Sequence, residues 1–212
     1  MIKVICFDVD GTLIDGNSWL SLTEGFGCSV SKHVQLYEDT VSGKITFEKA
    51  ERELVKLWQD SKNATKENLE KIYSNINLRK EAEGVFKHLR NKKYSIYLVS
   101  GSNKFFVERI AKKLKPDDCY SSAEIILDKD NIISQIDQKI TKQGQIKVDQ
   151  VNEIAEKHNA SIKEIYFVGD SENDIDVFIA TGRGISVHCQ NDYLKKIAWK
   201  NIESLDRLRE IL

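Results

Sequence analysis

The stretch IKVICFDVDGT (residues 2–12) decides the fold of this 212-residue chain. Its apolar half, residues 2–7, is rich in Ile, Val and Phe, which is typical of a strand that is buried on both faces. Two carboxylates, Asp8 and Asp10, follow directly, and Gly11 then permits a tight turn. The segment therefore predicts a buried strand whose C-terminal end carries acidic side chains.

Two further apolar runs end in a similar way. Residues 94–99 (YSIYLV) lead into Ser100, and residues 164–168 (EIYFV) lead into Gly169 and Asp170. Apolar residues recur at helical spacing between these runs, at residues 81–92, 105–114 and 146–158. The chain thus alternates between buried strands and amphipathic helices.

This alternation is typical of βαβ units. We therefore expect an α/β fold, with a Rossmann-like parallel sheet core and helices on both of its faces. GISV at residues 184–187 predicts a fourth strand. Residues 124–136 predict a two-stranded hairpin that turns at Asp128 to Asn131.

The region after the first strand does not follow this alternation. It contains three or four amphipathic helical patterns and no convincing strand, and Phe47, Leu54 and Trp58 belong to one apolar stripe at helical spacing. We expect a small all-α cap domain at residues 14–79. It would be inserted into a core domain formed by residues 1–13 and 80–212.

Composition excludes several classes of function. Lys and Arg number 32 and Asp and Glu 33, so the formal net charge of −1 gives no basic field for binding nucleic acid. No apolar run is long enough to span a membrane, and the N-terminus lacks the apolar segment of a signal peptide. The cysteines are scattered without metal-binding spacing, which predicts a reducing, cytoplasmic location. They are Cys6, Cys28, Cys119 and Cys189.

The polar residues that end the predicted strands should meet at one edge of the sheet, where ligands bind in open α/β folds. At that edge Asp8 can attack phosphorus as a nucleophile. Asp10 can protonate the leaving oxygen and later deprotonate water. The plainer interpretation is an acidic turn, since Asp and Gly are common turn residues.

The segment VGDSENDIDVF (residues 168–178) gathers acidic residues after another predicted strand. Hard oxygen ligands at a sheet edge suit Mg²⁺. Asp170 is the expected ligand, and Asp174 is either a second ligand or an acceptor behind it. The same acids can instead cap the helix that follows.

The tripeptide SGS (residues 100–102) precedes a helix expected from about Lys104. A hydroxyl group and backbone N–H groups at a helix N-terminus can bind an anion, although SGS also makes an ordinary turn. Lys147 lies on the helix before the strand at 164–168. Near the site it would neutralise phosphate and reduce its repulsion from Asp8.

Taken in order, these motifs resemble those of the haloacid dehalogenase-like phosphatase superfamily. They are DxDGT at residues 8–12, the serine at 100, the lysine at 147 and GDxxND at 169–174. Within the superfamily the chain looks most like phosphoserine phosphatases, which place a helical cap directly after the first motif. The resemblance implies Mg²⁺ as cofactor and an aspartyl-phosphate intermediate.

The resemblance also implies a role for each matching side chain. The implied catalytic residues are Asp8, Asp10 and Lys147. The residues implied for binding phosphate or substrate are Thr12, Ser100, Gly101, Ser102 and Asn173. The residues implied for binding Mg²⁺ are Asp8, Asp10, Asp170 and Asp174.

Two positions depart from the phosphoserine phosphatase pattern. Asn17 stands where those enzymes have a Glu that contacts the substrate amine. Leu54 stands where they have an Arg that pairs with the substrate carboxylate. A hydrocarbon side chain does not replace an Arg–carboxylate pair. The reaction type therefore carries over to this chain, whereas phosphoserine as the substrate does not.

We expect a cytoplasmic, Mg²⁺-dependent phosphomonoesterase that acts on a small phosphorylated metabolite, as a monomer or a homodimer. A phosphoryl-accepting signalling module is one alternative, which Asp10 and the helical insert disfavour because the first activates water and the second has no place in a receiver domain. A catalytically silent binding protein on the same fold is another. Phosphoryl transfer to an alcohol instead of water is a variant within the enzyme class.

Overall fold

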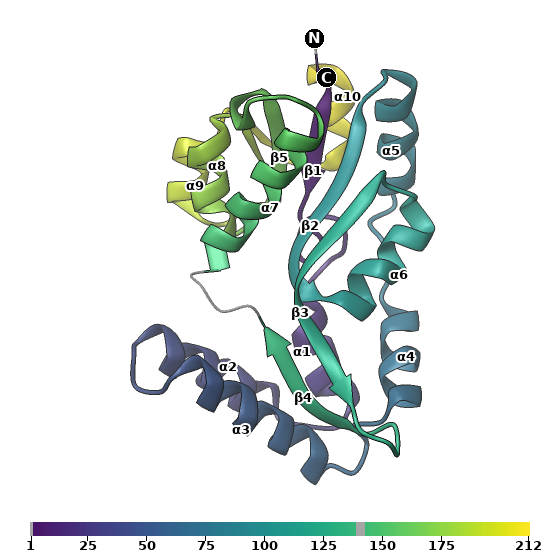
Figure 1. The fold of residues 1–212 in the computed structure, drawn as a ribbon, viewed down its shortest axis with the longest axis vertical. Coiled ribbons are helices and arrows are strands. Elements are labelled where there is room, and N and C mark those ends of the chain that lie inside the picture. Colours follow the sequence, from purple (N-terminus) through teal and green to yellow (C-terminus); the bar gives the residue numbers. More distant parts are fainter. Residues whose placement is uncertain (1, 139–142) are drawn as a thin grey trace. The chain divides into compact units, whose positions relative to one another are not determined.

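A computed structural model describes residues 2–138 and 143–212. In this part of the chain, strands form one sheet in the order β4-β3-β2-β1-β5-β6-β7 (Figure 1). The strands are β1 (Val4–Phe7), β2 (Ser95–Asn103), β3 (Asp118–Leu127), β4 (Ile133–Gln138), β5 (Ile165–Gly169), β6 (Gly184–Val187) and β7 (Lys200–Ile202).

The centre of the sheet is parallel. β1 pairs in parallel with β2 and β5, and β6 pairs in parallel with β5 and β7. Phe7, the last residue of β1, lies opposite Val168 of β5, and the N–H of Asp8 donates to the Val168 carbonyl oxygen at 2.9 Å. The predicted parallel α/β fold is confirmed, and β1 and β5 end side by side next to Asp8.

Helices cover both faces of the sheet, as predicted. In Figure 1, α5 (Ala82–Asn91) and α6 (Lys104–Leu114) lie on one side, and α7 (Gln143–Lys157), α8 (Ile175–Thr181) and α9 (Asp192–Ile197) on the other. A short α10 (Leu208–Ile211) ends the chain. Single 3-10 turns occur at Ile162–Glu164, Glu172–Asp174 and Leu205–Arg207. The core against α7 and α8 includes Cys6, Tyr97, Val99, Ile154, Phe167 and Phe178.

The chain divides into two compact units. The core unit contains Ile2–Gly16, Leu78–Ser122 and the described residues from Gln143 to Leu212. The second unit contains Asn17–Asn77 and the residues from Ala123 to the end of β4. β3 therefore begins in the core unit and continues into the second unit, where it pairs antiparallel with β4.

The paired part of β3 and β4, from Ala123 onwards, contacts other residues of the second unit. The N–H of Ile133 donates to the carbonyl oxygen of Ala64 at 2.9 Å, and Nε2 of Gln59 donates to the carbonyl oxygen of Ile133 at 2.8 Å. From the sequence this hairpin was placed with the core domain at residues 80–212. The assignment of residues 14–79 as the whole cap domain stays a prediction.

Four helices form the rest of the second unit. They are α1 (Ser18–Gly25), α2 (Val30–Val41), α3 (Phe47–Asp60) and α4 (Lys66–Asn75). Each follows a polar residue whose side chain accepts a backbone N–H of the first helical turn, which contributes about 1 kcal/mol per helix. These capping residues are Asn17, Ser29, Thr46 and Thr65.

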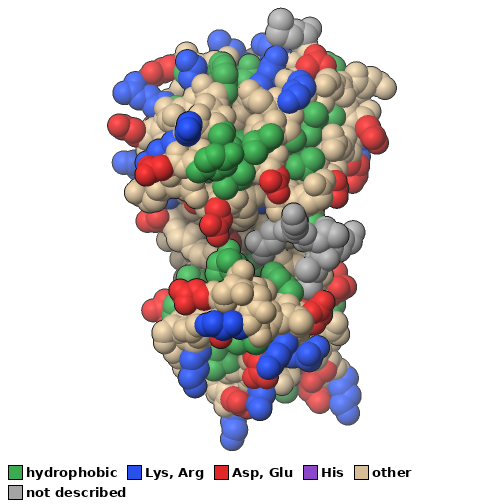
Figure 2. Space-filling model, turned by 90° about the vertical axis from the view of Figure 1, so that its left-hand side faces the viewer, with side chains coloured by type: hydrophobic (Ala, Val, Ile, Leu, Met, Phe, Trp, Pro, Cys, Tyr) green, Lys and Arg blue, Asp and Glu red, His purple; other side chains and the backbone are tan. Residues whose placement is uncertain are grey.

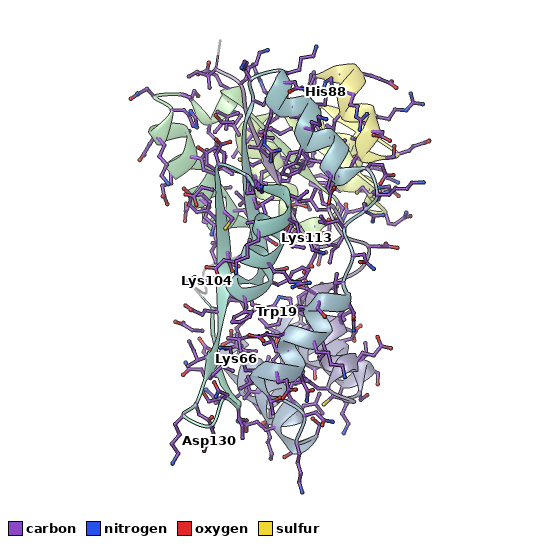
Figure 3. All side chains as sticks on the ribbon, turned by 90° about the vertical axis from the view of Figure 1, so that its right-hand side faces the viewer. Trp19, Lys66, His88, Lys104, Lys113 and Asp130 are labelled. Carbon is purple, nitrogen blue, oxygen red and sulfur yellow. The ribbon has the colours of Figure 1, made fainter. Side chains whose placement is uncertain are left out.

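The hairpin turns at the residues that the sequence predicts. The N–H of Asn131 donates to the carbonyl oxygen of Asp128 at 3.1 Å. Oδ1 of Asp128 accepts the N–H groups of Asp130 and Ile132, both at 2.9 Å. Asp130 lies at the tip of the hairpin (Figure 3).

Three features of the sheet differ from the prediction or were not predicted. Residues 100–102 belong to strand β2 and do not form a loop after it, because β2 continues past the end of β1 beside the ten-residue β3. The first part of β3 and the three-residue β7 were not predicted. Both are rich in polar and partly exposed residues, so neither shows the apolar pattern of a buried strand.

The surface carries charges of both signs. Figure 2 shows the face of the core unit that carries α8 and α9, where basic and acidic side chains alternate around apolar ones. In the described ranges, no helix combines the length and the apolar character needed to cross a membrane.

A polar network lies inside the second unit. The indole N–H of the fully buried Trp58 donates to Oγ1 of Thr23 at 2.9 Å, and this oxygen lies 2.7 Å from Nδ1 of His33. The rings of His33 and Trp58 meet edge to face, with centroids 6.3 Å apart. Burial lowers the pKa of His33 to about 4, so the imidazole is neutral near pH 7.

The second unit should therefore lose stability in mild acid. In the unfolded chain His33 binds a proton near its ordinary pKa of about 6.5, while in the folded chain it does so only near pH 4. The unfolded state thus holds more protons in this window, and the free energy of unfolding falls by about 2 to 3 kcal/mol as pH decreases through it. Urea unfolding followed by tryptophan fluorescence measures this change.

His33→Gln is the control. The difference in the free energy of unfolding between the wild-type protein and this variant, measured at each pH, gives the contribution of the imidazole. This comparison is needed because burial raises the pKa of Glu51, in the same unit, to about 7, which acts in the opposite direction. If the difference in the free energy of unfolding between the two proteins stays constant from pH 7 to pH 4, the role given to His33 is contradicted.

Candidate functional site

The first predicted acid is paired with a lysine inside the protein. Asp8 directly follows β1 and is 2% exposed. Nζ of Lys147, on α7, lies 3.0 Å from Oδ2 of Asp8. Lys147 itself is 2% exposed and has its ammonium 5.7 Å from the centre of the Phe167 ring. The sequence predicted that Lys147 acts near Asp8, and the structure brings the two charges into contact.

The same ammonium reaches the segment after β5. Nζ of Lys147 donates to Oδ1 of Asp174 at 2.6 Å and to Oδ1 of Asn173 at 2.9 Å. The second oxygen of Asp174, Oδ2, accepts the N–H groups of Asp170 and Ser171 at 3.0 and 3.3 Å. Both oxygens of Asp174 are thus engaged, and Asn173 contacts the lysine that holds Asp8.

A hydrogen bond links the first motif to the segment that follows β5. Oγ1 of the buried Thr12 donates to Oδ1 of Asp170 at 3.1 Å. Gly11, just before it, has φ +70°, and a Cβ atom added there would lie 2.1 Å from Oδ2 of Asp170. The turn after Asp10 therefore has no room for a side chain beside Asp170.

Burial and mutual repulsion perturb these acids. Burial and the neighbouring charges of Asp8 and Asp174 raise the pKa of Asp170 to about 7. Burial also raises the pKa of Asp174 to about 6, although the Lys147 charge opposes this. Burial disfavours the charge on Lys147, but Asp174 and Asp8 together outweigh it and raise its pKa. Strongly perturbed acids of this kind are typical of functional sites.

The donor set fits a hard divalent cation. Carboxylate oxygens of Asp8, Asp170 and Asp174 lie within 4.8 Å of one another. Mg²⁺ prefers oxygen ligands and takes few carboxylates, and a dication would reduce the repulsion that raises the pKa of Asp170. Asp170 is the carboxylate best placed to hold it, because Lys147 and backbone N–H groups contact both oxygens of Asp174 and of Asp8. Asp8 would have to share an oxygen between these contacts and the cation.

Asp10 contacts the second predicted motif. Oγ of Ser102 donates to Oδ2 of Asp10 at 2.6 Å, and the N–H of Ser102 donates to Oγ of Ser100 at 3.2 Å. Ser100 and Ser102 are each 1% exposed. A Cβ atom on Gly101 would meet only Oγ of Ser122, at 4.0 Å. The structure thus brings the SGS segment to the first motif through the Ser102–Asp10 contact.

One residue at the site had no signal in the sequence. Nη2 of Arg79 donates to the carbonyl oxygen of Gly11 at 3.0 Å and to Oδ1 of Asp15 at 3.3 Å. The backbone N–H of Arg79 donates to the carbonyl oxygen of Leu13 at 2.8 Å. Arg79 lies in no motif and was predicted only as the end of the helical insert, so its contact with the Gly11 turn depends on the fold.

Comparison with known proteins agrees with this geometry. Residues 2–182 match the family model described as haloacid dehalogenase-like hydrolase. The chain therefore belongs to the haloacid dehalogenase-like hydrolases.

Its relatives include phosphoserine phosphatases. The one from Methanocaldococcus jannaschii is 30% identical over 211 residues, which cover 99% of this chain and 96% of that protein. The one from Archaeoglobus fulgidus is 31% identical over 214 residues, which cover 99% of this chain and 60% of that longer protein. Among solved structures, a substrate-bound phosphoserine phosphatase complex matches with a TM-score of 0.79 and 26% identity, covering 100% of this chain and 97% of the other.

Replacing Gly11 should damage the acidic cluster. In Gly11→Ala the methyl group would displace the Asp170 carboxylate, and a non-glycine residue at φ +70° adds about 1 kcal/mol of strain. We expect at least tenfold weaker Mg²⁺ binding by calorimetry, together with lower stability in urea. Gly16→Ala is the matched control, since Gly16 has φ +85° but no atom within 4 Å of an added Cβ. Equal Mg²⁺ affinity in the two variants would contradict the importance of the Gly11–Asp170 contact.

Binding of Mg²⁺ should depend on pH through Asp170. A carboxyl group with a pKa of about 7 must lose its proton to bind a cation, so the affinity should fall by up to about tenfold per pH unit below pH 7. Calorimetry in two buffers of different ionisation enthalpy measures the protons released. Asp176→Asn, which removes an exposed acid outside the cluster, should leave the number of protons released on Mg²⁺ binding unchanged. An affinity that is constant from about pH 8 to about pH 6 would show that Asp170 is not a ligand.

Proposed function

We propose that this protein is a Mg²⁺-dependent phosphomonoesterase that cleaves a small phosphorylated metabolite through a phospho-Asp8 intermediate. One observation carries the proposal: Lys147 is buried between Asp8 and Asp174, with Asp170 beside them, at the C-terminal ends of β1 and β5. Membership of the hydrolase family and the likeness to phosphoserine phosphatases support it.

The first half-reaction would use Asp8 as nucleophile. A carboxylate oxygen of Asp8 forms a bond to phosphorus while the bond from phosphorus to the substrate oxygen breaks. Asp10 gives its proton to that leaving oxygen, so the product departs as an alcohol. Lys147 holds Asp8 in place and supplies positive charge beside the incoming phosphoryl group.

The second half-reaction would return the enzyme to its starting state. Asp10, now a carboxylate, takes a proton from water as the water oxygen attacks phosphorus. The bond between Asp8 and phosphorus then breaks and releases inorganic phosphate. Mg²⁺ held by Asp8, Asp170 and the backbone carbonyl of Asp10 would supply charge neutralisation for the phosphoryl group. Ser100 and Gly101 remain the proposed phosphate-binding residues.

We further propose that phosphoserine is not the preferred substrate. Asn17 is exposed and its Oδ1 already accepts the N–H groups of Trp19 and Leu20 at the start of α1. Leu54 is 8% exposed and lies on the buried face of α3 with Val55 and Trp58. Neither side chain supplies the charge that the resemblance associates with recognition of an amino acid.

The test is phosphate release from a panel of phosphomonoesters with saturating Mg²⁺. We expect one or more phosphomonoesters whose alkyl group carries no charge to be cleaved with kcat/KM on the order of 10⁴ M⁻¹s⁻¹ or more, and phosphoserine to be cleaved less well. Asp8→Asn should reduce release at least 1,000-fold, on the order of the loss seen when a nucleophile is removed. Mass spectrometry of acid-quenched enzyme should find a phosphoryl group on the peptide that contains Asp8.

The outcomes separate the parts of the proposal. No phosphate release from any ester by the folded protein would overturn the activity. Release that survives in Asp8→Asn would overturn the mechanism. Phosphoserine as the best substrate would overturn only the interpretation of Asn17 and Leu54.

A further inference from the structure

Ser102 contacts the acid that the mechanism uses twice. Its hydroxyl donates to Oδ2 of Asp10 at 2.6 Å, a short distance that is typical of a hydroxyl bonded to a carboxylate. A carboxylate only accepts, so the serine is the donor. Ser102 is 1% exposed, and a hydrogen bond to a charged group in such a place is stronger than one in water.

The position of Ser102 is itself fixed by further hydrogen bonds. Its carbonyl oxygen accepts the hydroxyl of Ser121 at 2.6 Å, and its N–H donates to Oγ of Ser100 at 3.2 Å. The carbonyl oxygen of Ser121 in turn accepts Nε2 of Gln150 at 3.3 Å. Gln150 follows Lys147 by three residues on α7, so one helix supports both the Asp8 side and the Asp10 side of the site.

We propose that Ser102 is a positioning residue for Asp10, and that it acts through the Asp10 carboxyl group and not by binding phosphate. This inference rests on the proposed function, in which Asp10 is the general acid and base. Because the Ser102 hydroxyl donates to Oδ2, the carboxyl group keeps one orientation, and the proton that Asp10 transfers is carried on Oδ1. Removing the hydroxyl removes this restraint, so the Asp10 proton is directed less well at the leaving oxygen.

The two possible roles predict different dependence on the leaving group. An alkyl alkoxide is a poor leaving group and needs the proton of Asp10 as the bond to phosphorus breaks. A p-nitrophenolate leaves without that proton. A residue that positions Asp10 therefore matters mainly for alkyl phosphates, whereas a residue that binds phosphate matters equally for both substrates.

The experiment compares the wild-type protein with Ser102→Ala on the best alkyl phosphate of the panel and on p-nitrophenyl phosphate. The parameter is kcat/KM, which reports the transfer of phosphate to Asp8. We expect a fall of about tenfold for the alkyl ester and of less than about twofold for the aryl ester. Inhibition by inorganic phosphate should keep the same constant, because the phosphate contacts are intact.

Ser186→Ala is the matched control. Ser186 is another buried serine of the core unit, and its hydroxyl donates to Oδ1 of Asn201, between β6 and β7. It should leave the ratio of the two kcat/KM values unchanged. Ser102→Gly, which also lacks the hydroxyl, is measured beside Ser102→Ala, and circular dichroism shows which variants are folded.

Equal losses for the two esters with weaker inhibition by phosphate would assign Ser102 to phosphate binding and overturn the inference. Unchanged kcat/KM for both esters would also overturn it. Asp8→Asn, assayed on the same two esters, distinguishes a failure of the proposed function from a failure of the proposal for Ser102. If that variant stays active the proposed function itself fails, whereas if it is inactive only the role of Ser102 is at issue.

Discussion

One buried ammonium group holds the acidic site together. Nζ of Lys147 contacts Asp8, Asp174 and Asn173 within 3.0 Å, and it comes from a helix that packs on the sheet beneath them. A buried charge that loses its partner destabilises a protein by about 3 to 5 kcal/mol, so the acids and the lysine depend on each other. Asp170 adds a further carboxylate to this cluster, and its burial, together with the charges of Asp8 and Asp174, raises its pKa.

The turn that carries Asp10 is held by the two connections to the second unit. The N–H of Gly11 donates to the carbonyl oxygen of Gly16 at 2.9 Å, and the carbonyl oxygen of Gly11 accepts Nη2 of Arg79 at 3.0 Å. Gly16 is the last residue before the second unit, and Arg79 lies directly after the return to the core unit. The N–H and the carbonyl oxygen of Gly11 are therefore both hydrogen-bonded. Asp10, which precedes Gly11, thus lies next to a residue that is bonded to Gly16 and to Arg79.

Much of this arrangement follows from the sequence because parallel strands end at one edge. Asp8, Asp10, Ser100 and Asp170 follow three short apolar runs, and that pattern was sufficient to predict that they come to one edge. The contact between the SGS segment and Asp10 is made by Ser102. The individual contacts of these side chains could not be predicted from the pattern of apolar and polar residues. Which carboxylate oxygen faces Lys147, and whether the hydroxyl of Ser102 points to a carboxylate or away from it, depend on distances of a few tenths of an ångström. The partly exposed start of β3 was missed for a different reason, since polar residues there give no apolar periodicity.

The two units obey different constraints. In the core unit the acidic cluster lies at the ends of β1 and β5, so the sheet fixes its position. In the second unit, α3 must bury Leu54, Val55 and Trp58 to fold, and Trp58 is tied to Thr23. An arginine in place of Leu54 would have to bury its charge on that face, which is unfavourable without a partner. Leu54 therefore serves the packing of the second unit and supplies no charge at position 54.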